Sequence, residues 1–291
     1  MAGEPATRSG LPFVKMHGLG NDYVYVDVFD PATRALVVDA VALARRVSDR
    51  HTGIGADGLI LIGPSNTAAA RMEMYNADGS RAEMCGNGLR CVARYLSDAA
   101  HATGDVLEIE TDAGVLGAWL HRKAGAVVAV TIDLGPPRFA PREIPLSVDA
   151  PEPVRLEVEA EGRSFEVTCL SMGNPHGVVF VPDVAHAPVG TWGPALERHP
   201  LFPRRANIEF VERVDATHLR QRTWERGSGE TKACGTGAGA VCVASHLAGL
   251  TSRAVAIELA GGVAELEWRE SDGCVHLTGP AVETFRGTFW L

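Results

Sequence analysis

Two cysteines that each precede a glycine-rich turn could carry acid/base chemistry. One stands in Cys85-Gly86-Asn87-Gly88, and the other, nearly half a chain away, in Cys234-Gly235-Thr236-Gly237. A thiol at the start of a helix lies beside unpaired backbone N–H groups and the positive end of the helix dipole, which favour a thiolate and hold anions. One such cysteine indicates a nucleophile, whereas two equivalent ones indicate a pair of acid/base groups.

Other short segments match between the two halves of the chain, in the same order and at nearly the same separation. The matching segments are Gly20-Asn21 with Gly173-Asn174, Ile109-Glu110 with Ile257-Glu258, Gly114-Val115 with Gly262-Val263, and Gly135-Pro136 with Gly279-Pro280. Matches in this order around a shared Cys-Gly-x-Gly favour an internal duplication, although convergent turn chemistry would also produce them.

The length of 291 residues accommodates two domains. We expect an N-terminal half-domain over residues 1–133 and a C-terminal half-domain over residues 134–280. The last strand, residues 281–291, lies beyond the second repeat. We expect it to return to the first half, although the pattern also allows it to stay with the second.

Most of the chain is predicted to form short strands, with few helices between them. Helices are expected at residues 39–50, near residues 193–198, and after each of the two cysteines. The last two are apolar on most sides, which predicts that they are buried. The predicted fold class is therefore α+β: two pseudo-symmetric domains, each a curled, mostly antiparallel sheet around a central buried helix, with the active site in the inter-domain cleft.

Composition excludes several functional classes. The net charge is -9 with scattered basic residues, so the footprint of a nucleic-acid-binding protein is absent from the sequence. No apolar run approaches the roughly 20 residues that span a bilayer. Residues 1–10 lack the apolar core of a secretory signal, which predicts a cytoplasmic protein. Six cysteines without a C-x-x-C pair are expected to be reduced thiols.

Two alternative uses of the glycines and cysteines are weaker. Residues 53–58 match the dinucleotide motif G-x-G-x-x-G, but they precede an apolar strand instead of following one and opening a helix. The spacings from Cys85 to Cys91 and from Cys234 to Cys242 differ from the short knuckles of zinc sites. Cys91 and Cys242 are therefore expected in the core, and no metal site is predicted.

Several polar residues stand at predicted strand ends. Any single asparagine there is more often a turn former, but together with a Glu-Arg pair such residues could grip ammonium and carboxylate groups at once. His176 and Glu225 are in addition candidate titratable neighbours of the thiols. The polar residues concerned are Asn21, Asn76, Asn174, Asn207, Glu225 and Arg226.

Longer stretches around these residues resemble the diaminopimelate epimerase family. The resemblance spans nearly the whole chain, and the joint occurrence of its motifs is highly specific. Proline racemase and the phenazine-pathway isomerase share the architecture but would not be expected to carry all of them. The matching stretches are Lys15–Asp22, Asn76–Gly79, Cys85–Gly88, Met172–His176, Arg205–Asn207 and Glu225–Gly237.

The resemblance implies a role for each matching residue. Cys85 and Cys234 would be the catalytic acid/base pair, with Cys234 deprotonating the LL isomer, and His176 and Glu225 would tune the thiols. The family has no cofactor and no metal, and a homodimer is expected. The residues implied to bind substrate are Asn21, Asn76, Gly86, Asn87, Asn174, Asn207, Glu225, Arg226, Gly235 and Thr236.

Two positions depart from the pattern of some family members. Gly58 stands where they carry glutamine, so any contact from that side chain must be absent or replaced. Phe285 stands where they carry a tyrosine associated with the dimer contact. The dimer is therefore expected with altered details.

The implied reaction interconverts LL- and meso-2,6-diaminopimelate, an amino acid of lysine and peptidoglycan precursor biosynthesis, without pyridoxal phosphate. Inversion needs a base on one face of the α-carbon and an acid on the other, which a thiolate and a thiol supply. Two alternatives stay open at this point. One is another cofactor-independent racemase or isomerase, such as a proline racemase-like enzyme, and the other is a thiol redox or metal-binding protein.

Overall fold

The computed structural model describes residues 9–291 and divides into two compact units. Unit 1 combines the chain up to Val130 with Pro280–Leu291, and unit 2 is the continuous segment Thr131–Gly279. Most of the N-terminal stretch from which a secretory signal was excluded, residues 1–8, lies outside the described residues.

Unit 1 is built from strands and three helices within the described residues. Its helices are α1 (Pro31–Leu36), α2 (Ala40–Ser48) and α3 (Gly86–Asp98). Strand β8 (Ala126–Asp133) begins in unit 1 and ends in unit 2. The other strands of unit 1 are β1 (Gly10–Gly18), β2 (Asn21–Asp27), β3 (Gly58–Gly63), β4 (Ala70–Asn76), β5 (Arg81–Ala82), β6 (Val106–Thr111), β7 (Gly114–Lys123) and β18 (Val282–Trp290).

Unit 2 has a similar composition of elements. Its helices are α4 (Val189–Glu197) and α5 (Gly235–Leu247). Its strands are β9 (Val154–Ala160), β10 (Arg163–Ser171), β11 (Pro175–Phe180), β12 (Asn207–Arg213), β13 (His218–Glu225), β14 (Gly229–Thr231), β15 (Ala254–Leu259), β16 (Gly262–Trp268) and β17 (Val275–Gly279).

Strand pairing follows the same order of directions in both units. In unit 1, β18, β1 and β2 pair antiparallel, β2 and β3 parallel, β3 and β4 antiparallel, β4 and β6 parallel, and β6 and β7 antiparallel. In unit 2, the strands β9, β10, β11, β12, β13, β15 and β16 repeat that order. The predicted fold class of two pseudo-symmetric, strand-rich halves is confirmed.

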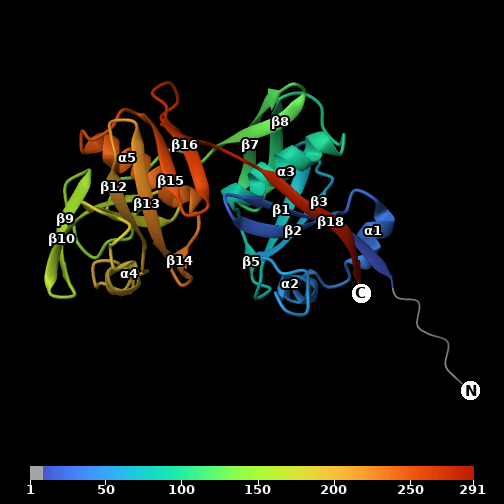
Figure 1. Cartoon of the computed structure of the whole chain (residues 1–291), viewed down its shortest axis with the longest axis horizontal. Helices are drawn as coiled ribbons and strands as arrows, with labels where there is room; N and C mark the ends of the chain where they lie inside the picture. The colour runs from blue at the N-terminus through green and yellow to red at the C-terminus, as the bar shows by residue number, and fades with distance from the viewer. Residues whose placement is uncertain (1–8) are drawn as a thin grey trace, which may run out of the picture. The chain divides into compact units, whose positions relative to one another are not determined.

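The C-terminal strand occupies the same place in unit 1 that β9 occupies in unit 2. β18 pairs antiparallel with β1 from Gly10 opposite Trp290 to His17 opposite Val282, with one register shift after Lys15. Figure 1 shows the red β18 beside the blue β1. The two ends of the chain therefore complete one sheet.

Each unit buries one helix, and each of these helices follows one of the two cysteines. In α3 the apolar residues Leu89, Val92 and Leu96 are fully buried, and α5 is buried from Gly237 to Ser245. The residues of α5 are nearly all small or apolar, so it packs against strands on several sides, among them β11, β12, β16 and β17. The prediction of two buried central helices is confirmed.

The remaining helices differ from the prediction in their bounds. Helix α2 begins at Ala40 because the side chain of Asp39 accepts hydrogen bonds from the N–H groups of Val41 and Ala42, both at 3.0 Å, and it ends at Ser48 instead of residue 50. Helix α4 extends from Val189 to Glu197, earlier than expected. Helix α1 was not predicted, although Asp30 caps it and proline occupies its first turn.

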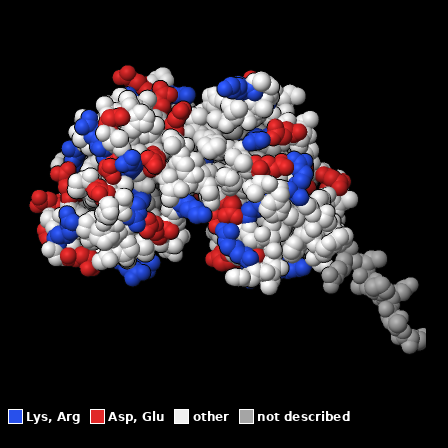
Figure 2. Space-filling view, viewed as in Figure 1, with Lys and Arg blue, Asp and Glu red and all other residues white. Residues whose placement is uncertain are grey.

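Charged residues of both signs are interspersed on the face of each unit in Figure 2. Within the described residues, no helix is long and apolar enough to cross a membrane. Each unit thus presents a mixed polar surface on that face. Its apolar residues are buried around the central helix and in a further cluster that includes residues of α2 in unit 1 and of α4 in unit 2.

Candidate active site

Cys85 is the N-cap residue of α3 and has extended backbone angles. Its side chain makes no capping hydrogen bond, so the sulfur is left for other partners. Alternation along β2 places Asn21 and Tyr23 on the same face of that strand. The Cys85 Sγ lies 3.3 Å from the Asn21 Oδ1, and the Tyr23 hydroxyl also hydrogen-bonds the thiol. This half-buried thiol is thus held from both the strand and the helix.

The orientation of Asn21 follows from its partners. Its Nδ2 donates to the Asp57 Oδ2 at 2.8 Å, and its Oδ1 accepts from the Asn87 Nδ2 at 3.2 Å. Because a carboxylate only accepts, the amide nitrogen must face Asp57, which leaves the amide oxygen facing Cys85. The fully buried Arg90 in turn donates from Nη2 to the Asn87 Oδ1 at 2.8 Å.

The electrostatics at Cys85 combine one unfavourable and several favourable contributions to the thiolate. Removal from water raises the pKa of the Cys85 thiol above its ordinary value. The backbone N–H groups of Gly88 and Asn87, the Tyr23 hydroxyl and the Arg90 guanidinium oppose that rise. The first turn of α3 therefore stabilises negative charge on this sulfur.

Cys234 is the N-cap residue of α5 and is buried, with 6% of its surface exposed. Its Sγ lies 3.6 Å from the Thr236 Oγ1. That hydroxyl accepts from the Asn174 Nδ2 at 3.3 Å, and the Asn174 Oδ1 lies 3.0 Å from the His176 Nε2. A chain of hydrogen-bonding groups therefore links the thiol to His176.

Behind His176 lies a buried acid that the sequence did not single out. The His176 Nδ1 is 2.9 Å from the Glu209 Oε1, and both side chains are fully buried. The residues stand on β11 and β12, whose parallel pairing sets Val178 opposite Glu209. Among the described residues, the Glu209 Oε2 has no hydrogen-bond partner.

Glu225, at the end of β13, lies within hydrogen-bonding reach of the Cys234 thiol. The Thr231 hydroxyl on β14 donates to its Oε1. Burial raises the pKa of Glu225, and the nearby Glu209 adds to the rise. Burial, followed by the charges of Glu225 and Glu209, raises the pKa of Cys234 well above its ordinary value, against the opposing Thr236 hydroxyl and the N–H of Gly237.

Three of the predicted substrate-binding residues have hydrogen-bond partners other than the two thiols and their neighbours. Asn207 accepts from the backbone N–H of Arg226 at 2.8 Å and donates to the Pro175 carbonyl at 3.4 Å. The exposed Arg226 donates from Nη1 to the Arg204 carbonyl at 3.3 Å. The Asn76 Nδ2 donates to the Ser80 Oγ at 2.9 Å. Their predicted contact with substrate stays a prediction.

The other predicted residues gather around the two thiols, each unit by itself. In unit 1, Asn21 and Asn87 are hydrogen-bonded beside Cys85, and Gly86 opens α3. In unit 2, Asn174, His176, Thr236 and Glu225 lie along contacts that lead to Cys234, and Gly235 opens α5.

Four residues that contact these groups were missed in the sequence: Tyr23, Asp57, Arg90 and Glu209. Two of them left a signal. Arg90 interrupts the apolar run of α3, and Glu209 stands alone between Ile208 and Phe210 in an apolar strand. A single charged residue in a buried segment indicates a paired or functional group, because charged side chains are almost never fully buried alone.

The structure accounts for the glycine at position 58. A Cβ atom there would lie 2.1 Å from the Tyr75 carbonyl oxygen and 2.9 Å from the Tyr23 ring. No side chain therefore fits at Gly58 with this backbone, and the Tyr23 ring stands in the adjacent space.

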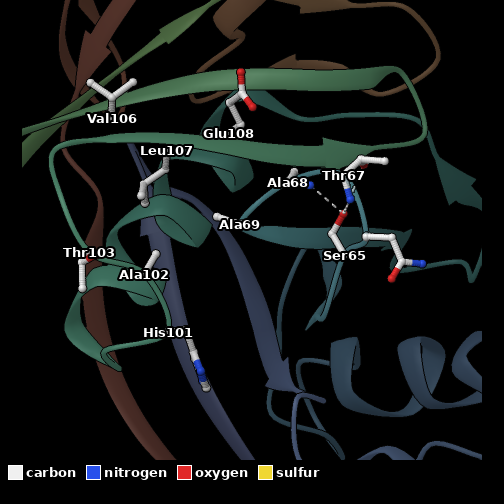
Figure 3. Close-up of a pocket in the computed structure, with 11 residues that line it drawn as sticks. Ser65, Thr67, Ala68, Ala69, His101, Ala102, Thr103, Val106, Leu107 and Glu108 are labelled. Carbon is white, nitrogen blue, oxygen red and sulfur yellow. Dashed lines mark hydrogen bonds between the residues drawn. The ribbon is translucent and has the colours of Figure 1, made fainter.

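A separate hollow of about 750 Å³ lies on unit 1 (Figure 3). It is lined by the segments 65–69, 101–103 and 106–108 and includes none of the predicted site residues. The Ser65 Oγ accepts from the backbone N–H groups of Thr67 and Ala68, the contacts drawn as dashed lines. Some polar groups that line the hollow thus form hydrogen bonds with one another.

Within residues 9–291, no group of three or more metal-ligating side chains is found, and all six cysteines are free thiols. Cys91 and Cys242 are fully buried in α3 and α5. Burial raises the pKa of Cys91 to about 11 and that of Cys242 to about 12, so neither is a ready thiolate near neutral pH.

Sequence comparison identifies close relatives over nearly the whole chain. A family model described as diaminopimelate epimerase matches residues 13–140 and 168–284. The chain is 50% identical over 281 residues to a diaminopimelate epimerase of Moorella thermoacetica, covering 97% of this chain and 100% of the relative. It is 49% identical over 278 residues to one of Acetivibrio thermocellus, covering 95% and 98%.

Solved structures of more distant proteins share the fold. A hydroxyproline epimerase from Agrobacterium vitis with bound trans-4-hydroxy-L-proline superposes with a TM-score of 0.67 at 16% identity, covering 97% of this chain and 93% of that one. A phenazine biosynthesis protein of the PhzF family from Bacillus anthracis has a TM-score of 0.65 at 14% identity, covering 97% and 100%. At these identities the likeness shows the fold alone.

Proposed function

Because this chain belongs to the diaminopimelate epimerase family, we propose that it interconverts LL- and meso-2,6-diaminopimelate with Cys85 and Cys234 as its two acid/base groups. It is an isomerase of the epimerase class that works without pyridoxal phosphate. The observation that carries the residue assignment is that each unit has a cysteine as the N-cap residue of its buried helix, with N–H groups of the first helical turn beside the sulfur.

In the proposed step, one cysteine is a thiolate and the other a thiol. The thiolate takes the α-hydrogen as a proton, so the Cα–H bond breaks, an S–H bond forms and the electron pair stays on the α-carbon. The second thiol then gives its proton to the opposite face and becomes the thiolate. The product has the inverted configuration, and the enzyme has exchanged the protonation states of its two sulfurs.

The difficulty of this step is the weak acidity of the α-hydrogen. A thiol has a pKa of about 8.5, and each unit of mismatch costs about 1.36 kcal/mol. Backbone N–H groups at a helix N-terminus stabilise negative charge where it develops on the substrate carboxylate. The first turns of α3 and α5 offer such groups beside each sulfur, so the proposal invokes no cofactor and no metal.

Substrate discrimination is assigned to the predicted polar residues of both units. We propose that Asn21, Asn76, Asn87, Asn174, Asn207, Glu225 and Arg226, together with Gly86, Gly235 and Thr236, bind the ammonium and carboxylate groups of diaminopimelate. His176 and Glu225 would adjust the thiols. The support is that carboxylate and amide oxygens suit ammonium groups, whereas amide N–H groups and a guanidinium suit carboxylates.

Incubation with LL-diaminopimelate in deuterated water tests the reaction. We expect deuterium at one α-carbon together with formation of the meso isomer, measured by mass spectrometry and chiral chromatography. Proline is the matched control substrate and should exchange no deuterium. Exchange with proline but not with diaminopimelate would contradict the assignment and favour a proline racemase-like enzyme.

We also propose that the protein is a cytoplasmic homodimer that binds neither nucleic acid nor membrane. In support, β18 exposes two large aromatic side chains, Phe285 at 46% and Trp290 at 58%. Sedimentation equilibrium should therefore give twice the chain mass of 30.9 kDa. The substitution Phe285→Glu should shift the distribution toward the monomer, with Val148→Glu, an exposed apolar residue of unit 2, as the control. A 30.9-kDa particle at micromolar concentration would contradict the dimer.

The duplication is a proposal of the same kind. We propose that the half-domains, residues 1–133 with 281–291 and residues 134–280, descend from one ancestral unit. Their equal order of strand pairings and their cysteine-capped helices support it.

A further inference from the structure

The two proposed acid/base thiols have unequal charged neighbours. Around Cys234, the carboxyl groups of Glu225 on β13 and Glu209 on β12 both act against a thiolate. Around Cys85, the principal charged neighbour is the Arg90 guanidinium on α3, which favours a thiolate. The starts of α3 and α5 therefore have a similar backbone, but the charged side chains around their cysteines differ.

Gly237 shows how close Glu209 comes to the thiol. A Cβ atom added to this glycine would lie 2.6 Å from the Glu209 Oε1 and 3.3 Å from the Cys234 Sγ. The carboxylate oxygen and the sulfur are thus no farther apart than the sum of these two distances. That is within the range of about 4–6 Å over which one charge shifts the ionisation of another.

Glu209 has few other partners that would neutralise it. Its Oε1 pairs with the His176 Nδ1, whereas its Oε2 has no hydrogen-bond partner within the described residues. The side chain is fully buried, so water does not screen its charge. Its strand neighbours Ile208 and Phe210 are apolar, and Thr223 stands opposite it on β13. The charge of Glu209 therefore acts on the groups at the start of α5, including the Cys234 thiol.

We propose that Glu209 is a positioning residue whose buried carboxylate keeps Cys234 in the thiol form, so that Cys85 ionises first in the free enzyme. It acts through the thiol and through His176 and does not itself contact the reacting carbon. The inference rests on the proposed function in one respect, because the two cysteines matter as acid and base only if they are the catalytic pair.

All charged and titratable groups that face Cys234 enter this inference. Glu209 and Glu225 oppose the thiolate, His176 on β11 pairs with Glu209, and the Thr236 hydroxyl and the Gly237 N–H favour the thiolate. At Cys85 the corresponding groups are Arg90, the Tyr23 hydroxyl, the Asn87 and Gly88 N–H groups, and the Asn21 oxygen, which accepts from the thiol. Tyr25 and Cys91 also interact with Cys85, and the Asp57 carboxylate lies one residue farther away, hydrogen-bonded to Asn21. Carboxylates that act on the thiol without an intervening residue are found in these sets only at Cys234.

The consequence is a preferred resting state. With Cys85 as the thiolate and Cys234 as the thiol, the free enzyme is ready to remove a proton with Cys85 and return one with Cys234. The opposite form, which takes the proton with Cys234, is the less populated form of the free enzyme. Glu209 thus makes the two duplicated thiols unequal in their readiness to ionise in the free enzyme.

The test measures the ionisation of each thiol in the full chain without substrate. The rate of iodoacetamide alkylation is followed against pH, and each cysteine is read separately by peptide mass spectrometry. In the native protein, Cys85 should react at lower pH than Cys234. In Glu209→Gln, removal of a like charge lowers the pKa of Cys234, so its alkylation at a fixed pH below that pKa should be about tenfold faster or more.

Three controls distinguish loss of the Glu209 charge from damage to the fold. The Cys85 profile in the same Glu209→Gln sample should stay as in the native protein, which also shows that the fold is intact. Glu209→Asp keeps the charge and should keep the native Cys234 profile. Glu212→Gln changes a glutamate farther along the same strand, paired with Arg220 at 3.2 Å, and should change neither thiol.

The proposal is overturned if Glu209→Gln leaves the Cys234 profile unchanged or moves it to higher pH, or if Glu209→Asp behaves like Glu209→Gln. If Glu209→Gln does not fold, Glu225→Gln replaces it for the charge effect, and Glu209→Asp must still keep the native profile. Because no substrate is present, these outcomes are independent of whether diaminopimelate is turned over. A loss of the proposed function would appear in the deuterium experiment alone.

Discussion

Replacement of Cys85 or of Cys234 by serine is expected to lower the epimerisation rate by at least about 100-fold in either direction. Positioned acid/base groups contribute typically 10²–10⁴-fold, and a serine hydroxyl is a much weaker acid than a thiol. Inversion uses both groups in every turnover, so either single substitution should have an effect of this size. The measurement is the rate of meso product from LL-diaminopimelate, with the reverse reaction as the second assay.

The same two variants distinguish proton removal from inversion. By family resemblance Cys234 removes the proton of the LL isomer, so Cys85→Ser should still exchange some deuterium into LL-diaminopimelate while inversion is lost. Cys234→Ser should show the converse with the meso isomer. The control is Cys274→Ser, a half-buried cysteine in the turn before β17, which should keep native activity. Retention of more than about one-tenth of the activity in either catalytic variant would contradict a two-thiol mechanism.

The second large effect is expected at Gly237, where alanine should lower kcat/KM by about 100-fold. The added methyl group would lie 2.6 Å from the Glu209 Oε1 and 3.3 Å from the Cys234 Sγ, so the carboxylate, the thiol or the helix start must move. Misplacement of a reacting group by about 1 Å can cost about 100-fold in rate. Steric conflict alone is responsible, because residue 237 lies in α5 and alanine favours a helix.

The matched control for this variant is Gly190→Ala in α4, where the added methyl group would have no neighbour within 4 Å. It should keep native kcat/KM and native stability. Both variants are to be compared by steady-state kinetics and by thermal unfolding. If Gly237→Ala keeps kcat/KM within about threefold of the native value, the thiol and the acid are not confined around this glycine as the structure describes.

The features that could be predicted from the sequence are those encoded locally. Cysteine followed by glycines determines a helix start, and the apolar residues that follow, such as Leu89 and Val92, determine that the helix is buried. Repeated Gly-Asn and Ile-Glu pairs predicted two similar halves. The order of parallel and antiparallel strand pairings is the same in both units. Each of these patterns extends over only a few residues, so residue type and spacing were enough to predict the helix starts, the buried helices and the two similar halves.

The residues that could not be predicted depend on contacts between distant strands. Glu209 meets His176 only because β11 and β12 pair in parallel with a particular register. Asp57 reaches Asn21 only because β3 pairs with β2. Register is set by the packing of the whole sheet, which a motif does not report. The short helix α1 was missed for another reason, since its six residues carry no clear apolar period.

The pairing of β18 with β1 has a consequence for synthesis of the protein. The ribosome synthesises β1 before unit 2 and β18 after it. The first unit must therefore leave the ribosome with an open sheet edge, while the second, encoded without interruption from Thr131 to Gly279, is complete earlier than its predecessor. A chain truncated before Pro280 would lose the closing strand of unit 1 and leave unit 2 whole.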